Sequence, residues 1–531
     1  MLALARPPKL WLFTFIVLGS FYVIHYGNQS FDLSFGNVGR LPPFNSPTSN
    51  SKPPSTTSGK YQAYPSDDAS LEIASTSVTA TSFPSDYLPS QSDDSECEAL
   101  YSSRYLEYIA SHHVPYCESG SHSKMECFRT HRNESLCIAM GVSINPQATE
   151  PESKIGMQCQ LRNFTLEAKS SSKAAAQLHD VLNVEDMPIG FFETGVKEQL
   201  KLWEISKRNV KTAKYTEGCT SAKNDGTWTL LVKRENHGNL FHKLMELWQA
   251  MITLDALQMA IDPSTQKPYL LPSEVPQIQV VFVQEQETGL VDELDEWWNM
   301  VTGQKPLLQR DLAPTCLGKV ILPLEGSTSP FWWAHWEEKD CHDRFLLDAF
   351  LRRVYRHLNI TATKHGNETD KTIVTVIDRR DRRRIRDLEA LVEKSRSRWP
   401  AATFQIIDFA SISLREQIDL VRNTDVLVGM TGAGLTHVLW LPEESSLAEI
   451  QAPNKRMPEA QPSTEFRNLA KMRGLHYLMA HPERREGANP WDWQTGEWVD
   501  VKDDVFQALV DAAINAQLHR GLSRGEVVPI I

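Results

Sequence analysis

The sequence predicts an α/β protein of two domains with mainly parallel sheets, preceded by a membrane segment and a disordered stem. Three observations support this prediction. Short apolar runs rich in β-branched residues alternate with segments of helical periodicity. The length of 531 residues exceeds that of one ordinary domain. A single uncharged apolar segment of membrane-spanning length stands near the N-terminus.

That apolar segment, residues 10–26, sets the expected compartment. Arg6 and Lys9 precede it, and the first charge after it is Asp32. The positive-inside rule therefore predicts a type II signal anchor, with residues 1–9 in the cytosol and the remainder in the secretory lumen. A cleavable signal peptide is the alternative, although the segment ends without a small-residue cleavage pattern. The final residues lack a KDEL-like signal, which favours the Golgi membrane over the endoplasmic reticulum.

The remaining composition fits a folded lumenal protein. The net charge of -12 argues against a general nucleic-acid binder. The eight cysteines predict up to four disulfides, whose pairing the sequence leaves open. Sequons for N-linked glycans occur at Asn28, Asn133, Asn163, Asn359 and Asn367.

Composition also divides the chain. Residues 27–95 are rich in Ser, Thr and Pro, which predicts a disordered stem because little apolar surface can be buried. Five cysteines between residues 97 and 159 indicate a disulfide-braced layer on the catalytic domain or a separate small module. We expect an N-terminal lobe at 96–365 and a C-terminal lobe at 366–531, joined by a polar stretch with two sequons.

The strands and helices follow from periodicity. Buried strands are predicted at residues 227–232, 277–283, 372–377, 404–407 and 425–428. Helices are predicted at residues 240–257, 344–357, 384–396 and 505–518. This alternation favours parallel strands with helical connections.

A first polar constellation, RENHGNLFHKLME at residues 234–246, follows a predicted strand. In a helix that begins at Asn239, the apolar residues form one stripe, and Asn239, His242 and Glu246 share the opposite face. Asn239 can cap the helix. A histidine and a carboxylate one turn apart can accept a proton or orient an acceptor hydroxyl. A solvated helix face would produce the same pattern.

A second constellation, DRRDRRRIR at residues 378–386, lies where a predicted strand ends and a helix begins. It concentrates six arginines, including Arg379 and Arg383, in an acidic protein. Ligands of parallel sheets lie beyond the carboxyl ends of the strands, and arginines there suit a diphosphate. The alternative is a solvated basic helix face.

A third constellation, DVLVGMTGAGLTHVLWLP at residues 425–442, combines a strand with a glycine-rich turn. Gly429, Gly432 and Gly434 let backbone amides approach a phosphate, and a helix is expected from Leu435. The pattern is neither the dinucleotide-binding fingerprint nor a Walker loop. An ordinary tight strand–helix turn is the alternative.

The phrases NLFHKLMEL, VIDRRDRRRIRDLEAL and GMTGAGLTHVLWLP, in this order, resemble glycosyltransferase family sixty-one over about residues 227–481. The resemblance implies a GT-B fold of two Rossmann-like lobes, a nucleotide-sugar donor and inversion at the anomeric carbon. It also implies N-acetylglucosamine or xylose as the sugar. By position it implies an N-x-x-H pair, a basic pair and a nucleotide-sugar-binding turn: Asn239 and His242; Arg379 and Arg383; Thr431, Gly432, Ala433, Gly434 and His437.

Two positions depart from the family pattern. Thr431 stands where the family usually has histidine, so a hydroxyl replaces one possible hydrogen-bond donor to the phosphate. Glu246 stands where aspartate is usual, which keeps the charge on a longer arm. These departures support the alternative of a non-catalytic, lectin-like or scaffold protein that retains the fold.

The sequence thus predicts an inverting transferase that moves a monosaccharide from a UDP-sugar to a protein- or glycan-linked hydroxyl. Arg379 and Arg383 would neutralise the leaving diphosphate, and His242 or Glu246 would take the acceptor proton. A two-lobed transferase can act without a bound metal cofactor, and dependence on a divalent metal is left open. The tryptophans of PFWWAHW, residues 330–336, could stack on a sugar, although packing in the core is their commoner use.

Overall fold

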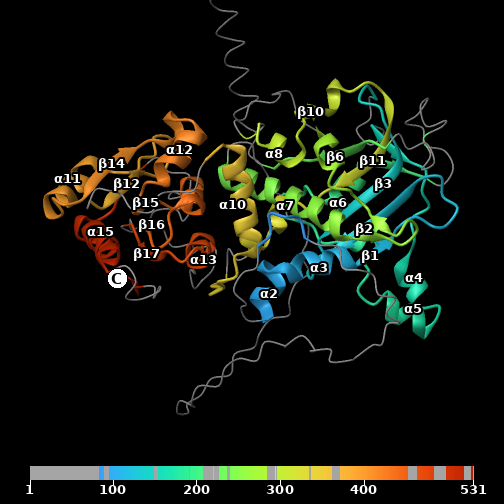
Figure 1. The fold of residues 1–531 in the computed structure, drawn as a ribbon, viewed down its shortest axis with the longest axis horizontal. Coiled ribbons are helices and arrows are strands. Elements are labelled where there is room, and N and C mark those ends of the chain that lie inside the picture. The colour runs from blue at the N-terminus through green and yellow to red at the C-terminus, as the bar shows by residue number, and fades with distance from the viewer. Residues whose placement is uncertain are drawn as a thin grey trace, which may run out of the picture. The chain divides into compact units, whose positions relative to one another are not determined.

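The structure is a computed structural model of the chain. It describes residues 83–88, 95–148, 154–190, 192–206, 219, 226–235, 239–283, 294, 296–333, 337–360, 371–451, 463–482, 498–519 and 528–529. These residues belong to one compact unit, Val78–Ile531, and form two large sheets with helices packed on them (Figure 1). No helix within these ranges is long and apolar enough to cross a membrane. The predicted membrane segment, residues 10–26, lies outside them.

The sheet nearer the C-terminus is entirely parallel in the described residues. Its strand order is β14-β12-β15-β16-β17-β19. The strands are β12 (Ile373–Ile377), β14 (Thr403–Ile407), β15 (Val426–Met430), β16 (Ser446–Ile450), β17 (His476–Ala480) and β19 (Val528–Pro529). Numbered by appearance, the first five have the order 2-1-3-4-5 of a doubly wound fold, whose switch point lies between β12 and β15.

Helices cover both faces of this parallel sheet, as the alternation of apolar residues along each strand requires. Val374 and Val376 share a core with α11 (Leu388–Arg398) and α15 (Asp503–Leu518). Leu427 and Leu447 face the opposite way, toward three other helical segments. These are α12 (Leu414–Val421), α13 (Glu465–Met472) and the 3₁₀ helix η9 (Ala433–Trp440). This part of the chain is therefore α/β, as predicted, with a parallel sheet covered by helices on both faces.

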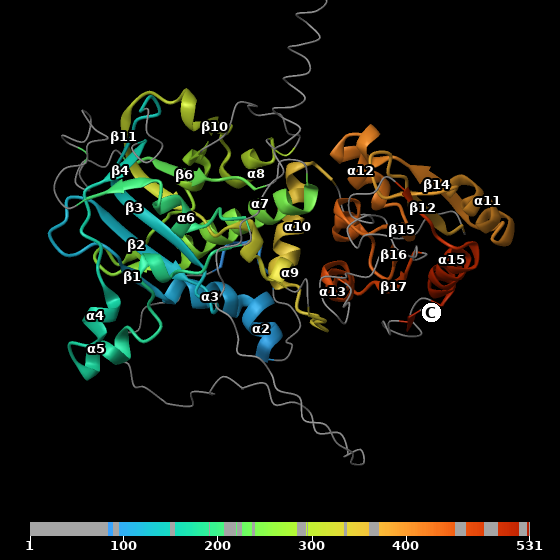
Figure 2. The ribbon, with the colours of Figure 1, turned by 180° about the vertical axis from the view of Figure 1, so that it is seen from behind.

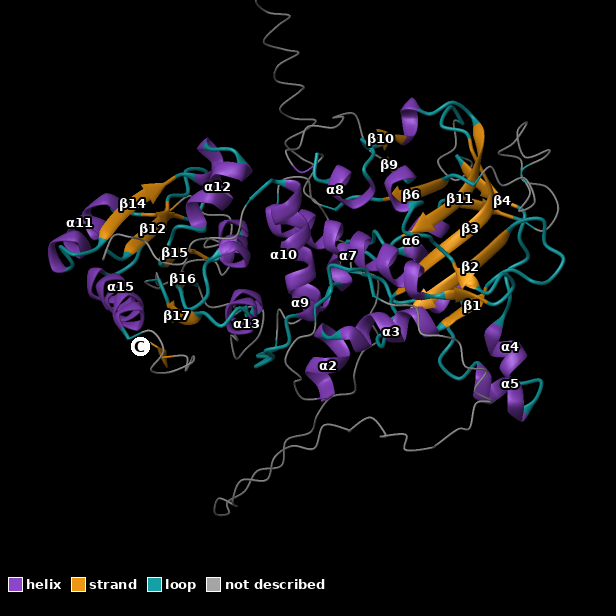
Figure 3. Ribbon diagram, in the orientation of Figure 1, coloured by secondary structure: helices purple, strands orange, loops and turns teal. Residues whose placement is uncertain are grey.

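The sheet nearer the N-terminus is mixed, which corrects the prediction of mainly parallel strands. Four strands, in the order β11-β6-β9-β10, are parallel. Strands β1, β2 and β3 continue the sheet from β11 in antiparallel pairs, and lie side by side in Figures 2 and 3. The strands are β1 (His113–Pro115), β2 (Lys124–Arg129), β3 (Ser135–Ile144), β4 (Ile155–Met157), β5 (Trp203–Ile205), β6 (Trp228–Val232), β9 (Gln279–Phe282), β10 (Leu307–Leu308) and β11 (Thr315–Leu322).

The antiparallel part of this sheet comes from the cysteine-rich stretch. Cys127–Cys137 links β2 to β3, and Cys117–Cys159 closes the same region. Cys97–Cys341 ties it to a later segment, and Cys219–Cys316 joins residue 219 to β11. The four predicted disulfides are therefore present, and the stretch is a layer of this sheet and not a separate module.

The helices on this sheet centre on α7 (Leu240–Met259). The other helices of this part of the chain are α2 (Ser95–Tyr101), α3 (Ser103–Ser111), α4 (Phe164–Ala168), α5 (Ser172–Gln177), α6 (Val196–Leu200), α8 (Trp298–Thr302), α9 (Pro330–Trp333) and α10 (Phe345–His357). Asn239 caps α7 as predicted, because its Oδ1 accepts a hydrogen bond of 3.0 Å from the Phe241 backbone N–H. Almost every residue of α7 from Leu244 onward is buried, so its polar face is not solvated.

The predicted elements occur with shifted ends. The five predicted strands are β6, β9, β12, β14 and β15, and the four predicted helices are α7, α10, α11 and α15. The basic segment differs, because Arg384–Ile385 forms a short strand, β13, paired with β18 (Trp498–Val499), before α11 begins at Leu388. The segment expected as a helix from Leu435 is the 3₁₀ helix η9.

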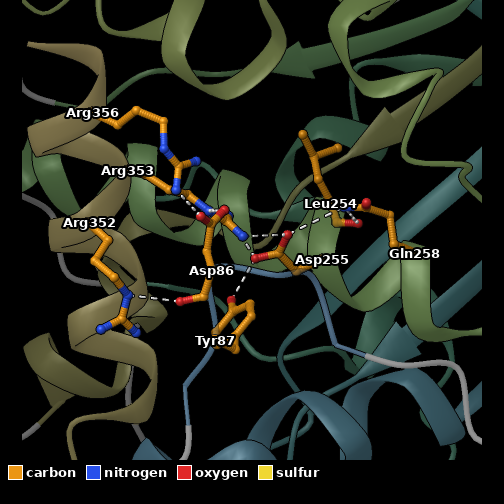
Figure 4. Close-up of polar contacts among 8 residues, drawn as sticks. All are labelled: Asp86, Tyr87, Leu254, Asp255, Gln258, Arg352, Arg353 and Arg356. Atoms are coloured by element: carbon orange, nitrogen blue, oxygen red, sulfur yellow. Dashed lines mark hydrogen bonds and ion pairs between the residues drawn. The ribbon is translucent and has the colours of Figure 1, made fainter. Parts of the chain in front are cut away.

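Residues 83–88 pack against α7 and α10, so the prediction of a disordered stem to residue 95 is wrong for them. The Tyr87 hydroxyl donates to Asp255 at 2.6 Å, and Arg353 binds both Asp255 (2.8 Å) and Asp86 (2.9 Å) (Figure 4). Arg356, on the same helix, also pairs with Asp86. The network joins the start of the compact unit to its two central helices.

Three of the predicted glycosylation sites lie within the described residues. Asn163 and Asn359 are exposed, and Asn133 is partly exposed in a turn where its φ is 63°. Asn28 and Asn367 lie outside the described residues. The exposed positions are compatible with the attachment of a glycan.

Removing Arg353 should destabilise the fold strongly. Arg353→Met leaves Asp255, whose side chain is 3% exposed, without its cation, and breaking a buried ion pair in this way costs about 3–5 kcal/mol. Arg356→Met is the matched control, because its side chain is 68% exposed and surface pairs contribute about 0–1 kcal/mol. Chemical denaturation should show the large loss in the first variant alone. Equal losses would show that the network does not carry this stability.

Candidate functional site

The switch point of the parallel sheet brings together residues of two predicted constellations. Arg379 and Arg383 follow β12, and the glycine turn follows β15. Gly432 has a φ of 130°, and a Cβ atom there would lie 2.9 Å from an Nη1 atom of each arginine. Arg383 Nη1 also donates to the Thr431 carbonyl at 2.9 Å. Both guanidinium groups therefore lie directly on the turn, which only a glycine permits.

These two cations have few anionic partners. Arg379 Nη2 lies 3.7 Å from the exposed Asp381, and its Nε donates to the Arg382 carbonyl at 3.1 Å. Burial lowers the pKa of Arg379, and burial together with Arg379 and Arg382 lowers the pKa of Arg383 to about 10. Arg383 also has a φ of 56°, a strained conformation that is commoner at functional sites. Such a cluster favours a bound anion.

The rest of the predicted turn divides into half-buried and buried positions. Ala433 and Gly434 are half-buried at the start of η9. Thr431 is buried, and its hydroxyl bonds to Glu449 at the end of β16. Burial raises the pKa of Glu449 to about 7, although Tyr477 donates to its carboxylate at 2.7 Å. Thr431 thus holds the turn in place through its contact with Glu449.

His437 lies apart from the two arginines. It is fully buried, its Nε2 is 2.7 Å from Gln417 Oε1, and its ring packs edge-on against Phe409. Burial lowers the pKa of His437 to about 3, so the ring is neutral at physiological pH. No described contact joins it to Arg379 or Arg383. In this structure His437 packs beneath the turn.

The mixed sheet presents a second polar edge. β6 and β11 are parallel neighbours, so the residues that follow them, Glu235 and Glu325, lie at the same edge. The Glu235 side chain is fully buried, and one of its oxygens, Oε1, accepts from the Ser327 N–H at 2.9 Å. The other, Oε2, lies 3.6 Å from His242 Nδ1. His242 therefore faces Glu235.

Helical spacing predicted that Glu246 shares a face of α7 with Asn239 and His242, and the structure shows that this face is covered at Glu246. Glu246 is buried, and its Oε1 accepts the backbone N–H of Glu235. The reason is that the loop after β6 and the segment containing Gly326 cover this face of α7; a Cβ on Gly326 would lie 2.8 Å from the Glu246 nitrogen. Glu246 braces the loop, while Asn239 caps the helix.

Aromatic rings enclose His242. Trp332 and Phe192 approach it edge-on, with ring centroids 4.3 Å and 4.7 Å away. Trp332 belongs to the predicted tryptophan cluster and is only partly buried. The residue before His242, Phe241, packs edge-on against Phe466 of α13 with ring centroids 5.9 Å apart, so the first turn of α7 reaches the parallel-sheet lobe.

Periodicity did not identify Glu235 and Glu325 as functional residues. Both lie in loops, where a regular repeat gives no information, and the strand that precedes Glu325 was not predicted. The available signal for Glu235 was its place directly after a predicted strand. Within the described residues, no three His, Cys, Asp or Glu side chains gather as metal ligands.

Comparison with known proteins confirms the family resemblance. A family model described as Glycosyltransferase 61 matches residues 327–448, which include Arg379, Arg383 and the glycine turn. The chain is 32% identical over 143 residues to the EGF domain-specific O-linked N-acetylglucosamine transferase of Pan troglodytes, covering 26% of this chain and 25% of that protein. For the protein of that name from Gallus gallus the identity is 30% over 185 residues, or 33% of each chain. The alignments thus span about a quarter to a third of these relatives.

Gly432 offers a test of the anion site. Gly432→Ala places a methyl group against both guanidiniums and strains the backbone, so binding of inorganic pyrophosphate should weaken about tenfold or more. Gly434→Ala is the control, because its Cβ would meet Ile377 at an ordinary 3.4 Å. Isothermal titration calorimetry measures both. Unchanged affinity in Gly432→Ala would remove the anion site from this turn.

Proposed function

We propose that this protein is an inverting glycosyltransferase of GT-B type that uses a UDP-sugar donor. The observation that carries the proposal is the pair Arg379 and Arg383, held against Gly432 at the switch point of a doubly wound sheet. Ligands of such sheets bind at the switch point, and two adjacent guanidiniums match the charge of a diphosphate. The matched family segment supports the same reading.

The two polar edges suit the two substrates of such a reaction. The parallel-sheet edge, with its cations, would bind the nucleotide and stabilise the diphosphate as charge develops on it. The mixed-sheet edge, with His242, would bind the acceptor. As the acceptor oxygen bonds to the anomeric carbon, the sugar–phosphate bond breaks and the acceptor proton passes to a base. His242 is positioned to be that base.

The relatives indicate which substrates to test first. Their name describes the transfer of N-acetylglucosamine to EGF domains, so UDP-N-acetylglucosamine is our first donor and an EGF domain our first acceptor. UDP-xylose is the second donor. We further propose that residues 10–26 anchor the enzyme in the Golgi membrane with its catalytic part in the lumen.

The deciding experiment is a donor screen. The full-length protein, purified in detergent, is incubated with a panel of nucleotide sugars, with and without acceptor, and nucleotide release is measured. The proposal requires that one donor is turned over. Binding of a UDP-sugar without turnover of any donor would instead support a lectin-like or scaffold role.

Arg379→Ala should weaken UDP binding by about 1.5–3 kcal/mol, the usual contribution of a charged hydrogen bond. The matched control is Arg380→Ala, because Arg380 is 68% exposed and pairs with Asp378, away from the turn. Calorimetry with UDP should separate the two variants. The same affinity in Arg379→Ala as in the parent would contradict the assignment of the phosphate site.

We also expect turnover to persist when divalent metals are removed. The paired guanidiniums supply positive charge where the diphosphate would lie, which is the role that a metal plays in other transferases. Rates measured in EDTA and after addition of Mn²⁺ should agree within about threefold. A rate that is lost in EDTA and restored by Mn²⁺ would overturn this expectation.

A further inference from the structure

We propose that Glu235 is a positioning residue that makes His242 the general base, and that Glu246 serves only to hold Glu235 in place. This inference rests on the proposed glycosyltransferase function and deepens it. The starting observation is that Glu235 Oε2, in a side chain with no solvent exposure, makes no hydrogen bond among the described residues. Its near neighbour is His242 Nδ1, at 3.6 Å.

The carboxylate is fixed by the residues around it. Ser327 donates its backbone N–H to Oε1, and Glu246 holds the Glu235 backbone through the N–H of that residue. The loop that carries Ser327 is itself held close to α7, because Gly326 leaves no room for a side chain. Glu235 therefore cannot turn away from His242 without breaking these contacts. The 3.6 Å separation exceeds a hydrogen bond, but such catalytic contacts commonly shorten when substrate binds.

This geometry selects one tautomer of His242. A charged Glu235 accepts the Nδ1–H, which leaves the lone pair of His242 on Nε2, on the far side of the ring. Nε2 can then remove the proton of the acceptor hydroxyl. The oxygen bonds to the anomeric carbon, the electron pair of the sugar–phosphate bond leaves with the diphosphate, and Glu235 stabilises the imidazolium that forms.

Two features distinguish Glu235 from Glu246 as the partner of His242. The Oε1 atom of Glu246 accepts the backbone N–H of Glu235, and any oxygen at that position could accept it. Glu235 directs an uncommitted oxygen at the ring. The aromatic walls of Trp332 and Phe192 also hold the ring of His242 edge-on and limit its rotation.

The charged groups near Glu235 define a pH dependence. Burial, followed by the nearby Glu246 and Glu325, raises the pKa of Glu235 to about 9, while the Ser327 N–H and the Thr194 hydroxyl oppose that rise. Below this pKa the protonated carboxyl donates to Nδ1, and the proton of His242 then resides on Nε2, where it blocks the base. Turnover should therefore rise with pH across the neutral range, by about tenfold per unit well below the pKa.

The test compares Glu235→Gln with Glu198→Gln. The amide keeps the Ser327 contact but presents an N–H or a weak acceptor to His242, so kcat should fall by about 10²–10⁴-fold and the rise of rate with pH should disappear. The KM for the donor and the affinity for UDP should stay within about threefold of the parent, because the phosphate site is elsewhere. Glu198 is a buried carboxylate near Glu325 without a described contact to His242, so Glu198→Gln should keep the parental kcat and pH profile.

Glu235→Asp is the second variant, in case the amide does not fold. It keeps the charge but draws the carboxylate back from the ring, so kcat should fall while the rate still rises with pH. A parental kcat and pH profile in a folded Glu235→Gln or Glu235→Asp protein would overturn the inference. If the parent turns over no nucleotide sugar, the proposed function itself fails, and the two failures are thereby distinguished.

Discussion

The contact of two guanidinium groups with the Gly432 backbone constrains the rest of the parallel-sheet lobe. Two cations at this separation repel each other, and burial removes the water that would screen them. Only a bound anion or rigid surroundings can offset the unfavourable free energy of this repulsion. The surroundings are rigid here, because Thr431 behind the turn is bonded to the buried Glu449, which Tyr477 also contacts. The turn is therefore already shaped in this structure, which would lower the entropy lost on binding the proposed phosphate.

The position of this contact depends on where strands β12 and β15 end, and the sequence indicates these ends clearly. Strands β12 and β15 are short, β-branched and bounded by polar residues, so their ends could be located to within two residues. The order of strands then places the two ends side by side, although that order is not visible in the sequence. Arg379 and Arg383 could be singled out because six arginines in an acidic chain are unusual. That these two reach the glycine while Arg380 and Arg382 face solvent depends on backbone conformation, including the positive φ of Arg383.

The structure of the mixed-sheet lobe was harder to predict from the sequence. Helical spacing placed His242 and Glu246 on one face correctly, but it carries no information about what covers that face. In the structure the loop after β6 covers it, and Glu246 becomes a brace. Glu235 lies in that loop, where no repeat marks it. The antiparallel strands β1 to β3 arise from a cysteine-rich stretch whose pairing, such as Cys127 with Cys137, composition alone leaves undetermined. Tyr87 is a further example, since a single aromatic residue in a polar stretch gives no sign that it will be buried.

Arginines crowd one polar edge and carboxyl groups the other, and this arrangement suits the proposed transfer reaction. In that reaction, negative charge would build on a diphosphate beside Arg379 and Arg383, and positive charge would build on His242, which Glu235 faces. Each arrangement is unfavourable alone, since crowding and burial lower the pKa of Arg383 and raise that of Glu235. The charges that would develop in the proposed reaction would relieve both conflicts together. Catalysis requires interactions that are stronger with the transition state than with the resting substrates, and both conflicts are of the kind that the transition state of the proposed reaction would relieve.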